Sequence, residues 1–183
     1  MAKTYEAIVF LVDGFEEIEA IATLDILRRG GVEAASVSLM GRRAVKGSRE
    51  ITIMADMILD DLHDTTGTML ILPGGPGTKN YKTHELLHEL LRMHNGDGGR
   101  IAAICAAPTV LDALGLLKNK TAVCYPTLDM YSPKPGKSNV VTDGNITTSK
   151  GPATTIEFAL ELVRLLKGME KAAEVSTALL YMA

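Results

Sequence analysis

The sequence predicts an α/β fold in which helices cover both faces of a mostly parallel β-sheet. Short apolar segments alternate along the chain with segments of helical periodicity, and this alternation is typical of parallel strands joined by helices. One apolar segment, 101–104, runs directly into Cys105 and then into a helical pattern that opens at Pro108. The chain of 183 residues is long enough for a sizeable core, so we expect a single domain over residues 1–183.

The elements of the N-terminal half follow from apolar runs, helical spacing and glycine stops. The apolar run before Asp13 predicts a first strand, and Gly30 with Gly31 ends the helix that follows it. An alternating segment on either side of Gly47 predicts a pair of short strands. The predicted elements are strands at 6–12, 32–39 and 69–72, a helix at 16–29 and the strand pair at 44–54.

The C-terminal half contains the clearest turn signal in the chain. Asp143 and Gly144 separate two alternating segments, a pattern that strongly indicates a β-hairpin. The predicted elements are helices at 83–93 and 156–166, a strand at 101–104, a helix from Pro108 that ends near Gly115, a strand at 121–125 and the hairpin at 140–148.

Cys105 lies where the predicted strand turns into the predicted helix. The small residues Ala103 and Ala107 stand two positions on either side of it, as a tight strand-to-helix turn requires. This is the nucleophile elbow of α/β enzymes with cysteine in place of serine. Backbone N–H groups at the start of the helix would favour the thiolate. The alternative interpretation is an inert, buried structural cysteine.

Two further segments fall at the carboxyl ends of predicted strands, where ligands bind in sheets of this kind. Glu19 lies near the start of the first helix and could face the strand ends, although a solvated helix face is the simpler interpretation. The loop 73–77 is rich in glycine, and its N–H groups could hold an oxyanion. A tight turn without a ligand explains the same glycines.

A third motif indicates different chemistry. His84 and His88 fit the HExxH pattern of zinc proteases, and His94 has the spacing of a third ligand. The extended motif needs glycine at position 91 to bend the chain, and this chain has leucine there. Helical spacing instead predicts that both histidines lie on a solvated face, opposite a buried stripe. That predicted stripe consists of Leu86, Leu87, Leu90 and Met93. We therefore expect no metal site.

Composition limits the location and the partners of the protein. No apolar run is long enough for a membrane span, and the run near the N-terminus is too short for a signal peptide. The net charge of -3 and the lack of Lys/Arg runs argue against nucleic acid as a partner. Two cysteines form no disulfide framework, so we expect a reducing, cytoplasmic location.

Taken together, the motifs resemble those of the DJ-1/ThiJ/PfpI superfamily, closest to its parkinsonism-associated deglycase branch and bacterial ThiJ-like members. The resemblance spans nearly the whole chain and rests on segments that occur in the family's order. It implies a flavodoxin-like three-layer sandwich and a homodimer. The segments are 13–19, 48–49, 72–75, 102–108 and 148–152.

The resemblance also implies roles for individual residues. Cys105 matches the family's reactive cysteine, and Glu19 matches a protonated carboxyl that hydrogen-bonds the cysteine sulfur. The other matched residues are Gly75 and Ala106, whose backbone N–H groups line the pocket, and Arg29 and Arg49, which lie near the pocket at the dimer interface.

Two positions depart from the family's pattern. Protease-like members carry histidine directly after the cysteine, and this chain has Ala106, which argues against a peptidase. The deglycase branch often has histidine before the proline of the next strand, where this chain has Tyr125. Tyrosine can donate a hydrogen bond but is a poor proton shuttle near neutral pH. Cys124, beside it, is interpreted as a core residue, with an interfacial or redox role as the alternative.

The resemblance implies a cofactor-free protective enzyme that acts on α-oxoaldehydes or on glycated amines and thiols. Cys105 would attack the aldehyde to give a hemithioacetal, and Glu19 would move protons. The alternative is a non-enzymatic oxidative-stress sensor or holdase chaperone that is switched by oxidation of Cys105. Both hypotheses use the same residues, so the sequence leaves them open.

Overall fold

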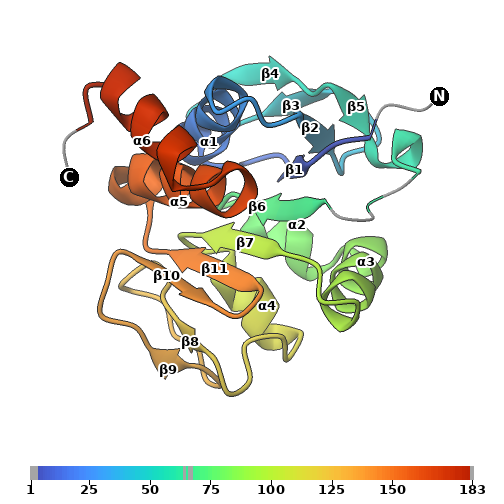
Figure 1. Cartoon of the computed structure of the whole chain (residues 1–183). Coiled ribbons are helices and arrows are strands. Elements are labelled where there is room, and N and C mark those ends of the chain that lie inside the picture. The colour runs from blue at the N-terminus through green and yellow to red at the C-terminus, as the bar shows by residue number, and fades with distance from the viewer. Residues whose placement is uncertain (1–3, 64, 66–67, 182–183) are drawn as a thin grey trace.

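The computed structural model describes residues 4–63, 65 and 68–181. In this part of the chain, a central sheet of seven strands has the order β10-β11-β7-β6-β1-β2-β5. Neighbouring strands are parallel except β10 and β11, which form the hairpin predicted across Asp143 and Gly144. Figure 1 shows the sheet between two layers of helices. The predicted α/β, flavodoxin-like fold is confirmed.

The strands of the sheet are buried along most of their length. Their apolar runs contact helices on both faces, as strands of parallel sheets do. The strands are β1 (Ala7–Leu11), β2 (Ala34–Ser38), β5 (Met57–Ile58), β6 (Met69–Leu72), β7 (Ile101–Ile104), β10 (Val140–Asp143) and β11 (Ile146–Ser149). Two small separate sheets pair β3 (Ala44–Lys46) with β4 (Thr52–Met54), and β8 (Thr121–Ala122) with β9 (Lys134–Pro135).

Helices on the two faces of the sheet build two separate cores. On one face, α1 (Glu17–Arg29), α5 (Thr155–Lys167) and α6 (Met169–Ala178) pack over the first core. On the other, α2 (Thr78–Lys82), α3 (Glu85–Gly96) and α4 (Pro108–Ala113) pack over the second core. Short 3-10 helices occur at Leu59–Asp61 and Pro152–Thr154.

Hydrogen bonds to the Glu17 carboxylate hold the strand pair β3–β4 beside the start of α1. Glu17 accepts hydrogen bonds from the Ser48 hydroxyl at 3.0 Å and from the Arg49 N–H at 2.5 Å. Gly47 packs so closely on this side chain that an added Cβ would lie 2.4 Å from its Oε1. The turn between the two strands is therefore held beside the first helical turn.

The predicted phase of helix α3 is wrong. The buried residues of this helix are Leu87, Leu91 and His94, whereas Leu86 and Met93 are 61% and 69% exposed. Leucines occur on two adjoining faces of the helix, so spacing alone favoured the wrong one. Gly99 packs against the His94 ring, and this contact selects the face that contains His94.

Within the described residues, no helix combines the length and the apolar character that a membrane crossing needs.

Candidate functional site

Cys105 forms a strained turn at the carboxyl end of strand β7 in the central sheet. Its φ of 64° lies in the left-handed region, which costs a non-glycine residue about 1 kcal/mol or more. The turn is held on both sides, because the Cys105 N–H donates to the Ser149 carbonyl at 2.9 Å and the Tyr125 N–H donates to the Cys105 carbonyl at 2.8 Å. The predicted elbow is therefore present, and Cys105 is 7% exposed.

The glycine-rich loop after β6 packs directly against this turn. A Cβ at Gly74 would lie 2.7 Å from the Cys105 Cβ and 2.8 Å from the Ala106 nitrogen. At Gly75, φ is 94° and a Cβ would lie 2.6 Å from the Glu16 nitrogen. Only glycine lets the backbone approach so closely at these two positions. As a result, the N–H groups of Gly75 and Ala106 both act on the Cys105 sulfur.

Glu19 enters the same site from the first turns of α1 and is completely buried. Its Oε2 accepts a hydrogen bond from the Gly74 N–H at 2.7 Å. Its Oε1 is buried and, among the described residues, has no hydrogen-bond partner of regular geometry. The carboxyl also interacts with the Cys105 thiol. The interpretation of Glu19 as part of a solvated helix face is thus wrong.

Burial and mutual interaction set the pKa values of the pair. Burial raises the pKa of Glu19 from 4.5 to about 7, although the hydrogen bonds with Gly74 and Cys105 act to lower it. Burial, then the charge of Glu19 and its hydrogen bond, raise the pKa of the Cys105 thiol to about 12. The N–H groups of Gly75 and Ala106 lower that pKa. Below about pH 7 both groups therefore hold their protons, and above it the pair holds one.

The expectation that the start of the helix favours the Cys105 thiolate needs correction. The helix that follows the elbow, α4, has six residues, and the sulfur is buried beside a carboxyl. The favourable N–H groups are present, but burial and the Glu19 charge outweigh them. The thiolate forms when its proton passes to Glu19, because the carboxylate charge then disappears. Glu19 is thus placed to act as the base for Cys105.

Replacing Glu19 by Gln should lower the pKa of Cys105, because the neighbouring negative charge is removed. We expect iodoacetamide to alkylate Cys105 of Glu19→Gln at least several-fold faster than in the unchanged protein at about pH 9, where Glu19 with its pKa of about 7 is ionised and thiolate is the reacting form. Cys124 serves as an internal reference, because its pKa is raised by burial and by Asp129 and Asp112. Mass spectrometry of both cysteines would measure the two rates, and a slower Cys105 reaction in the variant would contradict the assignment.

The structure places the other three predicted residues at different distances from the thiol. Tyr125 lies near the thiol, with Gly151 between them. A Cβ added at Gly151 would lie 3.3 Å from the Tyr125 ring and 3.9 Å from the Cys105 sulfur. Arg29 is in the last turn of α1, about 15 Å along the helix axis from Glu19, and pairs with Asp25. Arg49 lies in the turn between β3 and β4 and is exposed.

The zinc interpretation is contradicted by the roles that the histidines already have. His84 caps α3 by accepting a hydrogen bond from the Leu87 N–H through Nδ1. His88 Nε2 contacts the Tyr81 carbonyl at 2.7 Å, and His94 is buried under Gly99. Among the described residues, no three His, Cys, Asp or Glu side chains are gathered so that they could bind one metal ion. The predicted solvated face is also wrong for His84 and His88, which are half-buried.

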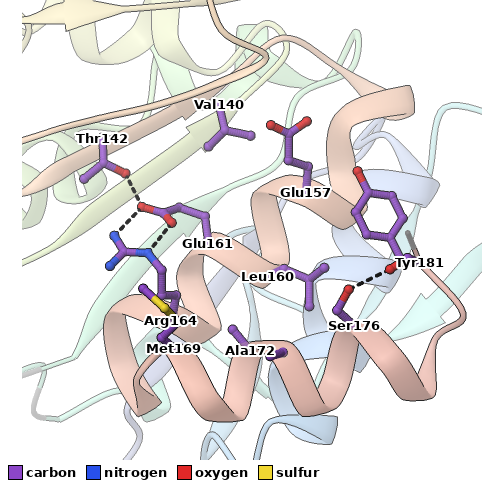
Figure 2. A pocket seen from close by; sticks show the side chains of 11 residues that line it. Val140, Thr142, Glu157, Leu160, Glu161, Arg164, Met169, Ala172, Ser176 and Tyr181 are labelled. Atoms are coloured by element: carbon purple, nitrogen blue, oxygen red, sulfur yellow. Dashed lines mark hydrogen bonds and ion pairs between the residues drawn. The ribbon is translucent and has the colours of Figure 1, made fainter. Parts of the chain in front are cut away.

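A cavity of about 460 Å³ between β10, α5 and α6 shares no residue with the Cys105 site. Figure 2 shows the side chains of Thr142, Glu161 and Arg164 turned toward one another. Glu161 accepts hydrogen bonds from the Arg164 Nε at 2.6 Å and from the Thr142 hydroxyl at 2.8 Å. These interactions hold the pKa of Glu161 below its ordinary value. Glu161 and Arg164 of this cavity are therefore already paired with each other.

Sequence reasoning identified the loop 73–77 but missed the specific role of Gly74, and it missed Gly151. Gly74 supplies the N–H that binds Glu19, and Gly151 leaves the space between Tyr125 and the sulfur. Both occur in segments on which the family resemblance rests, namely 72–75 and 148–152. Their roles depend on close approach of distant segments, which spacing along the chain does not reveal.

Comparison with known proteins gives consistent matches over the whole site. The sequence model of the DJ-1/PfpI family matches residues 5–165. The chain is 42% identical over 180 residues to the protein dj-1beta of Drosophila melanogaster, covering 95% of this chain and 96% of that protein. It is 38% identical over 177 residues to the glutathione-independent glyoxalase DJR-1.2 of Caenorhabditis elegans, covering 93% and 94%. The solved structure of oxidized DJ-1 from Toxoplasma gondii has a TM-score of 0.91 at 35% identity, covering 98% and 100%.

Proposed function

Because the chain belongs to the DJ-1/PfpI family, we propose that it is a cofactor-free glyoxalase or deglycase that converts α-oxoaldehydes to 2-hydroxy acids. The observation that carries the proposal is the buried pair of Cys105 and Glu19, with two backbone N–H groups aimed at the sulfur. The relative named as a glutathione-independent glyoxalase supports the same assignment. The pair contains a nucleophile, a base and donors for an oxyanion.

The first step uses the shared proton of the pair. As the Cys105 sulfur attacks the aldehyde carbon of methylglyoxal, Glu19 takes the thiol proton and becomes a neutral acid. The carbonyl π electrons move to oxygen, where the N–H groups of Gly75 and Ala106 stabilise the developing charge. Glu19 then returns its proton to that oxygen, which gives a neutral hemithioacetal.

The second stage is an internal redox change followed by hydrolysis. Glu19 removes the proton on the hemithioacetal carbon, and protonation of the neighbouring carbon converts the ketone to an alcohol. The hemithioacetal carbon thereby becomes a thioester of Cys105 and lactic acid. Water cleaves the carbon–sulfur bond and restores the thiol. The sum is methylglyoxal plus water to lactic acid, so no external oxidant or reductant is consumed.

The test is a methylglyoxal-to-lactate assay on the unchanged protein and on Cys105→Ala in parallel. We expect many equivalents of lactate per protein chain from the unchanged protein and none above the protein-free background from the variant. Lactate formation at equal rates in both samples would refute a role for Cys105.

A sensor function is the second candidate, and one observation favours it: a structural relative is described in an oxidized form. Cys105 has the N–H groups that would stabilise an oxidised sulfur anion, and a protonated Glu19 would donate to it. A sensor reacts at most once per chain without a reductant. The number of lactate equivalents therefore separates the two candidates.

An apolar surface on α1 and on the segment that contains the strand pair β3–β4 supports the proposed homodimer. Ile18, Ile21, Ile51 and Met54 are 56%, 42%, 51% and 66% exposed. The same two segments carry the arginines expected at the interface, at positions 29 and 49. Large exposed apolar side chains that gather on one surface are typical of a protein interface.

We expect light scattering at micromolar concentration to give twice the mass of the chain, 19.6 kDa. Met54→Glu should shift the protein toward the monomer, because it places a charge in the apolar surface. The matched control is Met93→Glu on α3, a similarly exposed methionine on the opposite layer. A monomer for the unchanged chain, or equal effects of both variants, would contradict the proposal.

A further inference from the structure

The cavity between β10, α5 and α6 contains two carboxylates, of which one is paired with a cation. Helix α5 carries Glu157 and Glu161 one turn apart, and both line the cavity. Like charges at this i,i+4 spacing repel each other. Arg164 pairs with Glu161 through two nitrogens, at 2.6 and 2.8 Å, so the charge of Glu161 is compensated. A cation beside Glu157 would compensate the second charge in the same way.

The contacts of Glu157 leave its charge without a cation. Its Oε2 accepts a hydrogen bond from the neutral Asn139 amide at 3.2 Å. Lys150 contacts the oxygen of that same amide at 3.4 Å, and among the described residues no ammonium or guanidinium forms an ion pair with Glu157. Because Glu157 is half-buried, its unpaired charge is less well solvated than a charge on the open surface.

The rest of the cavity is mainly apolar. Its walls include Val140, Leu160 and Met169, and the small side chain of Ala172 leaves space between α5 and α6. The volume of about 460 Å³ lies within the range of about 300–1,000 Å³ that is usual for sites of small organic ligands. A carboxylate next to apolar walls fits a ligand that has one positive group on an apolar body.

Tyr181 adds an aromatic ring to the wall of the cavity. The chain turns back after α6, because the Tyr181 N–H donates to the Ser176 carbonyl at 3.0 Å and the Ser176 hydroxyl donates to the Tyr181 carbonyl at 2.7 Å. In Figure 2 the ring and the Glu157 carboxylate both lie to the right of the pair of Glu161 and Arg164. Aromatic faces attract cations, so the ring favours the same class of ligand.

We propose that this cavity, the ammonium pocket, binds a small primary amine that carries an apolar group. The protonated amine donates hydrogen bonds to the Glu157 carboxylate, and such charge-assisted bonds are stronger than neutral ones. The apolar group packs against Leu160, Met169 and Ala172. The pocket shares no residue with the Cys105 site, so the inference does not depend on the proposed function.

Calorimetry with two matched compounds tests the ammonium pocket. Cyclohexylmethylamine carries an ammonium group near neutral pH, whereas cyclohexylmethanol has a neutral hydroxyl in the same place. We expect the unchanged protein to bind the amine about tenfold more tightly than the alcohol. Glu157→Gln should lower the affinity for the amine to that for the alcohol, because it removes the charge and keeps the volume of the side chain.

Two further variants locate the bound amine. Glu170→Gln removes an exposed carboxylate on α6 that does not line the cavity, and it should leave both affinities unchanged. Ala172→Leu fills part of the cavity and should abolish binding of both compounds. If Ala172→Leu does not fold, the comparison of Glu157→Gln with Glu170→Gln decides the question.

Three results would overturn the ammonium pocket. The first is that the unchanged protein binds the two compounds equally or binds neither. The second is an equal loss of amine binding in Glu157→Gln and Glu170→Gln, which would indicate a general effect of surface charge. The third is that folded Ala172→Leu still binds the amine, because the amine would then lie outside the cavity.

Discussion

Replacing Cys105 by Ser should reduce lactate formation to the protein-free background. A serine hydroxyl at this position remains protonated near pH 7 and lacks the polarizable sulfur. Glu19, with its pKa raised to about 7, is too weak a base to ionise an alcohol substantially. Serine fills nearly the same volume, so the elbow should persist. Lactate assays on protein with an unchanged thermal unfolding midpoint would measure the effect.

Chelation and histidine replacement provide the control for this experiment. We expect activity to survive EDTA and to survive His84→Ala combined with His88→Ala. The double variant should lose about 1 kcal/mol of unfolding free energy, since His84 caps α3 and a lost cap costs about that much. Activity that disappears with EDTA while Cys105→Ser retains it would replace this interpretation with a metal-dependent one.

Replacing Glu19 by Gln should lower turnover on the order of a hundredfold, because the transferable proton is removed. The substitution should leave no cavity, because the amide occupies the same volume. Its oxygen can still accept a hydrogen bond from the Gly74 N–H. Alkylation of Cys105 should continue, and turnover alone should fall. Unchanged turnover would leave Glu19 with a structural role.

The pH profile of the unchanged protein gives the same assignment a second readout. The reaction needs the form of the Cys105–Glu19 pair that has lost one of its two protons. The fraction of protein in this form rises about tenfold per pH unit below the Glu19 pKa of about 7, so kcat/KM should rise in the same way and then level off. Glu19→Gln should move the plateau away from pH 7, because the proton that must then be lost is that of the Cys105 thiol. The measurement is kcat/KM between pH 5 and pH 7 in steps of about one unit. A constant kcat/KM over this range would count against Glu19 as the base.

The free energy of unfolding should fall as the pH rises, whereas kcat/KM should increase. The pKa of Glu19 is raised from 4.5 to about 7 on folding, so the folded state holds a proton that the unfolded state releases in this range. The free energy of unfolding therefore falls by about 3 kcal/mol as the pH rises through this window. Glu19→Gln should show no such contribution, and urea unfolding at several pH values would measure the difference.

The parts of the fold that could be predicted are those with strong local signals. Strands β6 and β7 were predicted at their observed bounds, since apolar runs end there at a proline loop and at Cys105. Helix α2, Thr78–Lys82, has a polar sequence without apolar spacing, and it forms because Tyr81 is buried and donates to the Phe10 carbonyl. Helix α6 was missed beyond Gly168, because its single buried residue is Val175.

The site was predictable as a set of residues but not as a set of pKa values. Cys105 and Glu19 are identified by their positions after strands and by the family resemblance. Whether a carboxyl beside a thiol lowers or raises the pKa of that thiol depends on burial, distance and the N–H groups around it. Those quantities come from the contacts of Gly74 with the elbow and of Gly75 with the segment 14–16, and these segments lie far apart in the sequence.

The left-handed backbone of Cys105 and the buried carboxyl of Glu19 have a consequence for natural selection. Each is a local cost to the folded state, since one residue is strained and the other has a buried oxygen without a regular partner among the described residues. A population selected for thermal stability alone would accumulate substitutions at these two positions before it altered the cores. If related proteins retain both residues, selection has maintained the chemistry of the site. Loss of either residue in a lineage would indicate that this selection has ended there.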